Sequence, residues 1–277
     1  MTLMDKTYPP KTNVYEHGIA VEGDERPESL RLIATARLPI HAFFNLSIVD
    51  FAGRSLNERA VHLADIKGPH YSADYFEEHD LKYSVLASLY HLNQLINLYV
   101  LCIQRFSTSN GMHGNTNDPR VFYEIDAFLG AARRVYVFIE KEISKHYFQK
   151  RRGSSVQNVI GKLRNVLPLF ATELQESWDT FGNKLKRYRD CVAHNDPLNE
   201  GSTTCWMNRY GNQWGMTIKL PDNPDEEERS NFDFNSGPEA LSYCHSVACH
   251  LVGLCESLES QPKIASYLAN PRMDASK

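Results

Sequence analysis

The 277-residue sequence contains no C-x-x-C pair and no uninterrupted apolar run long enough to cross a membrane. Its six cysteines lie mostly inside apolar helical patterns, which favours buried thiols in a reducing cytoplasm over a disulfide framework. The longest apolar stretch, residues 87–103, is interrupted by four polar residues, so we expect no membrane span. The first 18 residues have no apolar core, so we expect no signal peptide and a cytoplasmic location.

An excess of positive charge is also missing. The chain has 30 Lys and Arg against 34 Asp and Glu, which gives a formal net charge of -4. RNA binding would therefore need a local basic patch, because affinity for phosphates depends on Lys and Arg at the contact. Hydrophobic residues make up 42% of the chain, which is enough for one large domain or one domain with an appendage.

The N-terminal third shows the least regular pattern. Residues 1–78 are predicted to be an arm and an appendage of uncertain structure, because polar, turn-rich sequence precedes a segment of mixed periodicity. Within it, residues 30–52 fit either a short helix followed by a strand or two strands. Residues 54–78 fit irregular structure with one or two helical turns.

From residue 79 the apolar positions follow a helical period. The predicted helices are 79–106, 118–146, 156–166, 171–194 and 235–260. Asp118 and Pro119 together favour a helix start, since the first can cap and the second fits the first turn. Pro168 is expected to break the chain between two helices. Residues 262–277 are predicted to be a C-terminal tail.

A short β segment interrupts the helices. Residues 203–220 form two β-like runs around Tyr210-Gly211-Asn212 and predict a hairpin insertion. The acidic segment that follows, 221–231, is expected to be a mobile loop. The predicted fold is mainly α: a helical bundle over residues 79–261 with a β-hairpin insertion and an N-terminal appendage.

The stretch most suggestive of chemistry is Arg189-Asp190-Cys191-Val192-Ala193-His194, at the end of a predicted helix. Asp190 and His194 are four residues apart and share a helix face, while Arg189 lies about 140° round the helix from His194. Together they could supply a proton-transfer group, an orienting carboxylate and a cation for a phosphate. The alternative is that the helix dipole alone favours basic residues at this end.

This stretch resembles the R-x4-6-H motif of the HEPN (higher eukaryotes and prokaryotes nucleotide-binding) domains. The segment Phe122 to Ile143 resembles their acidic second helix, and the resemblance extends from His79 to Gln261. It implies a HEPN-like bundle, no cofactor and a homodimer that cleaves RNA without a metal. By this resemblance, His194 would be base or acid, Arg189 would hold the phosphate and Asp190 would orient or bind.

The resemblance also implies the chemistry: attack of the ribose 2′-OH at a site shared by two copies, which yields a 2′,3′-cyclic phosphate. It is compatible with a toxin or an antiviral defence effector. HEPN toxins paired with a nucleotidyltransferase often carry a tyrosine two residues after the histidine. Asp196 stands there in this chain, so that pairing is not implied.

Four further residues are candidates for binding RNA. Glu124 is expected to be a partly buried acid near Arg189, on the strength of the resemblance. Lys186, Arg151 and Arg152 are candidate phosphate contacts, the last two in a basic loop beside Tyr147 and Phe148, which could stack on bases. The alternative is that this basic loop is an ordinary solvent-exposed surface with no role in binding RNA.

A metal site is not expected. Cysteine and histidine alternate near residues 244–250, but zinc needs three or four well-placed ligands and no second cluster is evident. Two alternatives to a ribonuclease remain from the sequence. One is a non-catalytic HEPN-like module that binds RNA, a nucleotide or a protein partner. The other is an unrelated helical scaffold in which the motif is only a helix end.

Overall fold

The computed structural model describes most of the chain from residue 80 onward. The described residues are 47–48, 71–72, 80–108, 118–149, 155–194, 198, 205–210, 213–226 and 228–269. Within these ranges the structure is mostly helical, which confirms the mainly α class. Of the predicted appendage it describes β1 (Ser47–Ile48) and β2 (Tyr71–Ser72), which pair antiparallel. The other expectations for residues 1–78 lie outside the described residues.

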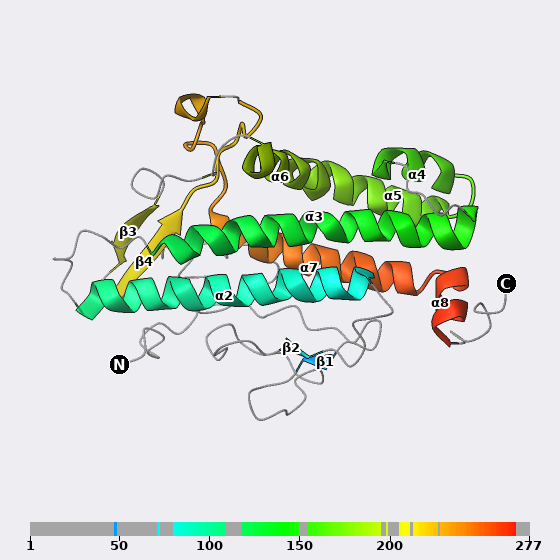
Figure 1. Cartoon of the computed structure of the whole chain (residues 1–277), viewed down its shortest axis with the longest axis horizontal. Helices are drawn as coiled ribbons and strands as arrows, with labels where there is room; N and C mark the ends of the chain where they lie inside the picture. The colour runs from blue at the N-terminus through cyan, green and yellow to red at the C-terminus, as the bar shows by residue number, and fades with distance from the viewer. Residues whose placement is uncertain are drawn as a thin grey trace.

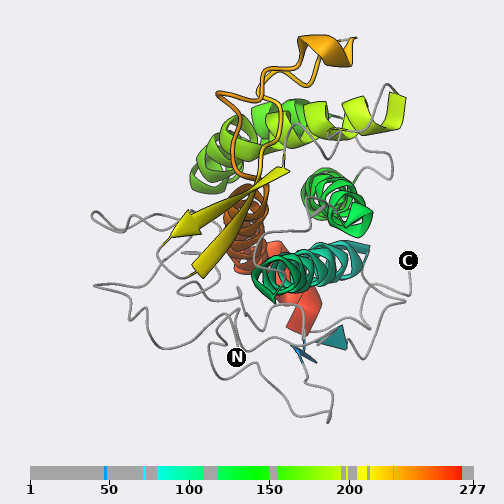
Figure 2. The same ribbon diagram turned by 90° about the vertical axis from the view of Figure 1, so that its left-hand side faces the viewer.

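Two long antiparallel helices, α2 (Asp80–Thr108) and α3 (Pro119–Phe148), form the centre of the bundle (Figure 1). The helical spacing predicts both. Asp118 caps α3 as expected: its carboxylate accepts a hydrogen bond from the backbone N–H of Arg120, and Pro119 occupies the first turn. Figure 2 shows α3 between α2 on one side and α6 on the other.

Helix α2 is also long and apolar enough, between Tyr83 and Phe106, to cross a membrane by length and composition. However, 61% of its apolar window is buried against the rest of the chain. A core helix of a bundle meets the same criteria, because it must be apolar on most of its surface. The absence of a membrane span stays a prediction from the sequence.

The next helical run is α4 (Val156–Leu163), α5 (Pro168–Ser177), the π-helical turn η3 (Trp178–Gly182) and α6 (Asn183–His194). The last three cover the single helix predicted for this region. Pro168 does not only break the chain: it is the first residue of α5, where its missing N–H costs no helical hydrogen bond. The predicted start near Ala171 is therefore one turn late.

The predicted hairpin is confirmed. Strands β3 (Cys205–Tyr210) and β4 (Gln213–Ile218) pair antiparallel, with Tyr210 opposite Gln213. The Trp214 ring packs edge-on against Phe106 of α2, with 4.7 Å between the ring centroids. This contact fixes the hairpin to the end of α2 and gives Trp214 a packing role.

The chain ends in α7 (Ala240–Glu259) and α8 (Pro262–Ala269). Helix α7 begins five residues after the predicted start at residue 235, and the Glu239 side chain caps it. The predicted tail also begins too early, since its first eight residues form α8, which contacts α3 and α7.

Glu239 joins three elements of the fold. Its buried carboxylate accepts hydrogen bonds from the Tyr99 hydroxyl of α2 and the backbone N–H of Ser242 in α7, both at 2.8 Å. The backbone N–H of Ile218, the last residue of β4, is 3.4 Å away. Burial and the neighbouring Glu239 charge raise the pKa of Tyr99 well above its usual value, so that hydroxyl stays a donor.

Candidate functional site

The last turns of α6 bring three of the predicted site residues together. Arg189 Nη1 lies 2.9 Å from Asp190 Oδ1, and Lys186 Nζ lies 3.1 Å from Asp190 Oδ2. The side chains of Lys186 and Arg189 are about half exposed, at 52% and 51%, and that of Asp190 is 35% exposed. His194 is the last residue of α6, and its side chain lies outside what the structure describes.

Asp190 is a charged acceptor and not a proton donor in this arrangement. Burial alone would raise the pKa of its carboxyl group, but hydrogen bonds from Arg189 and Lys186 outweigh burial and lower it. Both oxygens are occupied by these cations. The carboxylate therefore holds Arg189 against the end of α6 and leaves the remaining guanidinium nitrogens for another partner. Whether Asp190 also bonds His194 stays a prediction.

Glu124 does not pair with Arg189. Its Oε2 lies 2.8 Å from Nδ1 of His91 on α2, and both side chains are about three-quarters buried. Asp126 comes two residues later, which is about 200° round the helix, so it lies on the opposite flank of α3. The same flank carries Arg133, seven residues after Asp126, and the charges of Asp190 and Arg189 in α6 act on it. Of the two acids at the start of the family-like segment, Glu124 and Asp126, Asp126 is thus the one on the side of the motif helix.

Asp126 is a half-buried carboxylate without a hydrogen bond or ion pair to any described residue. Burial raises its pKa from 3.8 to about 6. One sequence pattern could have pointed to this face of α3. Asp126, Gly130 and Arg133 are spaced at i, i+4 and i+7, so they lie on the same side of the helix. Arg133 was missed, because alone it looks like an ordinary surface cation.

The raised pKa of Asp126 predicts a specific pH dependence. Between about pH 4 and pH 6 the folded chain binds this proton more tightly than the unfolded chain, so stability falls as the pH rises through that range. We expect Asp126→Asn to raise the free energy of unfolding at neutral pH and to lose this advantage towards pH 4. Urea titrations of both proteins from pH 4 to 8 check it. An equal difference at every pH would contradict the buried ionised carboxylate.

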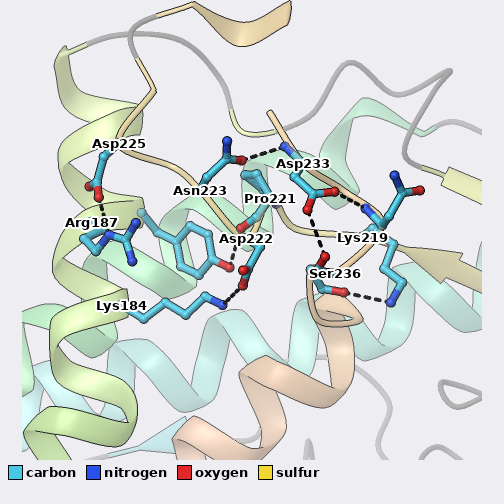
Figure 3. A network of polar contacts seen from close by, with 12 residues as sticks. Lys184, Arg187, Lys219, Pro221, Asp222, Asn223, Asp225, Asp233 and Ser236 are labelled. Carbon is cyan, nitrogen blue, oxygen red and sulfur yellow. Dashed lines mark hydrogen bonds and ion pairs between the residues drawn. The ribbon is translucent and has the colours of Figure 1, made fainter. Parts of the chain in front are cut away.

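A loop from Pro221 to Ser236 covers the other flank of α6 (Figure 3). Lys184 Nζ lies 2.7 Å from Asp222 Oδ1, and Arg187 donates to Asp225. These ion pairs neutralise two of the basic side chains of α6. The Tyr188 hydroxyl, which is buried, donates to the backbone carbonyl of Pro221 at 2.8 Å and anchors the start of the loop.

The loop is also held together by hydrogen bonds between its own described residues, while the expectation that it is mobile stays a prediction. Asn223 accepts a hydrogen bond from the backbone N–H of Asp233 and donates to the carbonyl of Asn231. The Asp233 carboxylate accepts from the Ser236 hydroxyl and the Asn235 backbone N–H (Figure 3). Asn and Asp side chains bond nearby backbone in this way and thereby order an irregular segment.

The remaining predicted residues divide into two groups. Arg151 and Arg152 lie outside the described residues. Tyr147 is not free to stack on a base: its hydroxyl lies 3.3 Å from the backbone N–H of Lys263, whose ammonium group sits over the Tyr147 ring. Among the described residues, no three His, Cys, Asp or Glu side chains group as metal ligands, and all six cysteines are free thiols.

Three comparisons with known proteins bear on the identity of this bundle. No family model, no curated protein and no solved structure matches the chain. The likeness to HEPN domains therefore rests on the residues of α3 and α6 alone.

Proposed function

We propose that this chain is a metal-independent endoribonuclease of the HEPN type that cleaves RNA at a site built from two copies of α6. The observation that carries the proposal is the partly exposed cluster of Lys186, Arg189 and Asp190, four to eight residues before His194. A helix end that carries a cation five residues before a histidine has the groups that transfer of a phosphodiester needs. We further propose a cytoplasmic homodimer that acts as a toxin or a defence effector.

The proposed reaction uses one histidine from each copy. One His194 takes the proton of a ribose 2′-OH, and the 2′-oxygen attacks the adjacent phosphorus. The bond from phosphorus to the 5′-oxygen breaks, and the second His194 gives that oxygen a proton. The products are a 2′,3′-cyclic phosphate and a 5′-hydroxyl. One histidine serves both ends of an in-line displacement poorly, whereas two copies across a two-fold axis can serve them separately.

Arg189 would bind the non-bridging phosphate oxygens, where negative charge develops in the transition state. Its pairing with Asp190 supports this role, because the carboxylate fixes the guanidinium and reduces the entropy lost on binding. Lys186 adds a second cation on the same carboxylate. The local charge of this cluster is positive although the whole chain is acidic.

A non-catalytic module is the second candidate, and one observation favours it. The loop over α6 already neutralises Lys184 and Arg187, so only part of the basic surface of the helix remains for RNA. Such a module would bind RNA, a nucleotide or a protein partner and cleave nothing.

One experiment separates the two candidates. The purified chain is incubated with a single-stranded RNA of mixed sequence in the presence of EDTA, and the fragment ends are analysed. We expect cleavage, with cyclic phosphate and 5′-hydroxyl ends, that is lost in Arg189→Ala and His194→Ala. Binding without any product would favour the module. Cleavage that survives both substitutions would refute the site.

A further inference from the structure

One cation on the α6 side of α3 has no counterion in contact among the residues that the structure describes. Arg133 makes no hydrogen bond or ion pair with any described residue, and its Nη1 atom is buried without a partner. The residue as a whole is partly buried. A charge removed from water without a partner is costly, which makes an external anion its natural complement.

The Trp178 ring supports this guanidinium. The Arg133 Cζ atom lies over the ring, 5.1 Å from its centroid, which is a cation–π contact. The ring itself is held on two further sides. Tyr136 of α3 meets it edge-on, with centroids 5.5 Å apart, and Gly182 of η3 lies so close that a methyl group there would collide with the ring.

The widened turn explains how the ring reaches this position. In η3 the backbone N–H of Asn183 donates to the carbonyl of Trp178, five residues back, so one extra residue is accommodated between α5 and α6. Gly182 is the last residue of η3, and because it has no side chain it leaves room for the Trp178 indole ring. Turns of this kind are frequent at functional sites. The stack of Gly182, Trp178 and Arg133 is thus a preformed support for one cation.

Helix α6 packs against α3, and two of its charged residues act on Arg133. Burial lowers the pKa of Arg133, while the charge of Asp190 raises it and that of Arg189 lowers it further. These two residues are therefore near enough for their charges to act on Arg133. Arg133, Lys186 and Arg189 together outnumber the carboxylates of Asp126 and Asp190 in this region, so it attracts anions.

From these contacts we infer that Arg133, held on Trp178, is a phosphate-binding subsite for the RNA strand beside the Arg189 cluster. It binds a phosphodiester next to the one that is cut and adds affinity, not chemistry. A planar guanidinium fixed by stacking suits this role, because it can offer two parallel donors to one phosphate at little entropic cost. This inference rests on RNA being the substrate, as proposed above.

The test measures binding of a single-stranded 2′-O-methyl RNA, which cannot be cut by 2′-oxygen attack, as a function of salt. We expect Arg133→Ala to weaken binding roughly tenfold near physiological salt and to lower the slope of log K against log salt by about 0.7. Arg134→Ala is the matched control: the neighbouring arginine is exposed and lies about 100° away on α3. It removes the same charge and should change the affinity much less.

Two more variants keep the inference testable if Arg133→Ala folds poorly. Arg133→Lys keeps the charge but not the planar fork, so it should preserve the salt slope and lose part of the affinity. Gly182→Ala keeps every charge but displaces the Trp178 ring, and it should weaken RNA binding without changing the slope. Circular dichroism confirms that each variant is folded.

The outcomes separate this inference from the proposed reaction. If Arg133 and Arg134 variants bind alike, or the wild-type chain does not bind the RNA, the subsite is wrong, whether or not RNA is cut. If binding depends on Arg133 but no RNA is ever cleaved, the subsite stands and the nuclease proposal fails. In cleavage assays Arg133→Ala should raise KM and leave kcat nearly unchanged, since it contributes binding alone.

Discussion

Replacing His194 by alanine is expected to lower the rate of RNA cleavage roughly 10²- to 10⁴-fold, the usual contribution of a positioned acid or base. Arg189→Ala should cost roughly 10²- to 10³-fold, because it removes a cation from the developing charge of the phosphate. The rate should also follow a bell-shaped curve with pH, since one histidine must be neutral and the other protonated. Single-turnover cleavage of a labelled RNA measures all three effects.

Matched controls come from the same helices. Arg187→Ala removes a guanidinium two residues from Arg189, but one that is held by Asp225 on the flank covered by the loop. His91→Ala removes an imidazole that pairs with Glu124 between α2 and α3. Neither change should reduce cleavage more than a few-fold. Equal losses in Arg187→Ala and Arg189→Ala would mean that only the overall charge of α6 matters.

If the active site is shared between two copies, a dimer with only one His194 should be inactive. Wild-type and His194→Ala chains are unfolded together, mixed and refolded so that their subunits combine at random. With about nine variant chains for each wild-type chain, about one dimer in a hundred keeps both histidines. Activity should then fall to about one hundredth. A fall to only about one tenth would show that each copy cuts alone.

The helices could be predicted because their signals are local. In α3 the apolar positions repeat at helical spacing and Asp118-Pro119 marks the start, so neither depends on the rest of the fold. Pro168 shows the limit of such signals. Proline fits a first helical turn as well as it breaks a helix, and the residues around it do not distinguish the two.

The candidate site was predictable only along α6. Arg189, Asp190 and Lys186 are neighbours on one helix, so their spacing alone brings them together. Arg133 could not be found in this way, because its importance depends on a tryptophan 45 positions later and on the extra residue of η3. Glu124 was expected near Arg189 by resemblance, but it pairs with His91 of α2, a contact that depends on how α2 packs against α3.

The acidic loop illustrates the same difficulty. Its composition is typical of a mobile segment, because six of the eleven residues from 221 to 231 are charged. The two ends of the loop are joined by hydrogen bonds between residues that are 18 positions apart in the sequence. The backbone N–H of Leu220 donates to the carbonyl of Pro238, and Lys219 donates to the carbonyl of Gly237. No local sequence pattern predicts that the segments around residues 219–220 and 237–238 contact each other.

That close approach leads to the largest expected change in stability. A methyl group at Gly237 would overlap the carbonyl oxygen of Leu220, a backbone atom that cannot move aside alone. We expect Gly237→Ala to lower the free energy of unfolding by roughly 2–4 kcal/mol, because the contact between the two ends of the loop must open. Urea denaturation followed by circular dichroism measures it as a lower midpoint.

The chain offers an opposite control in Gly253, an exposed position in the middle of α7 where a methyl group would meet no atom within 4 Å. Gly253→Ala should raise the free energy of unfolding by about 0.5–1 kcal/mol, since alanine is the better helix former. If Gly237→Ala lowers the stability and Gly253→Ala raises it, the loss at Gly237 comes from the packing there and not from the replacement of glycine itself.

If Gly237→Ala unfolds at the wild-type midpoint, the loop does not close on Leu220. Lys184 and Arg187 would then be available to RNA in solution, and the basic surface of α6 would be larger than the folded loop allows.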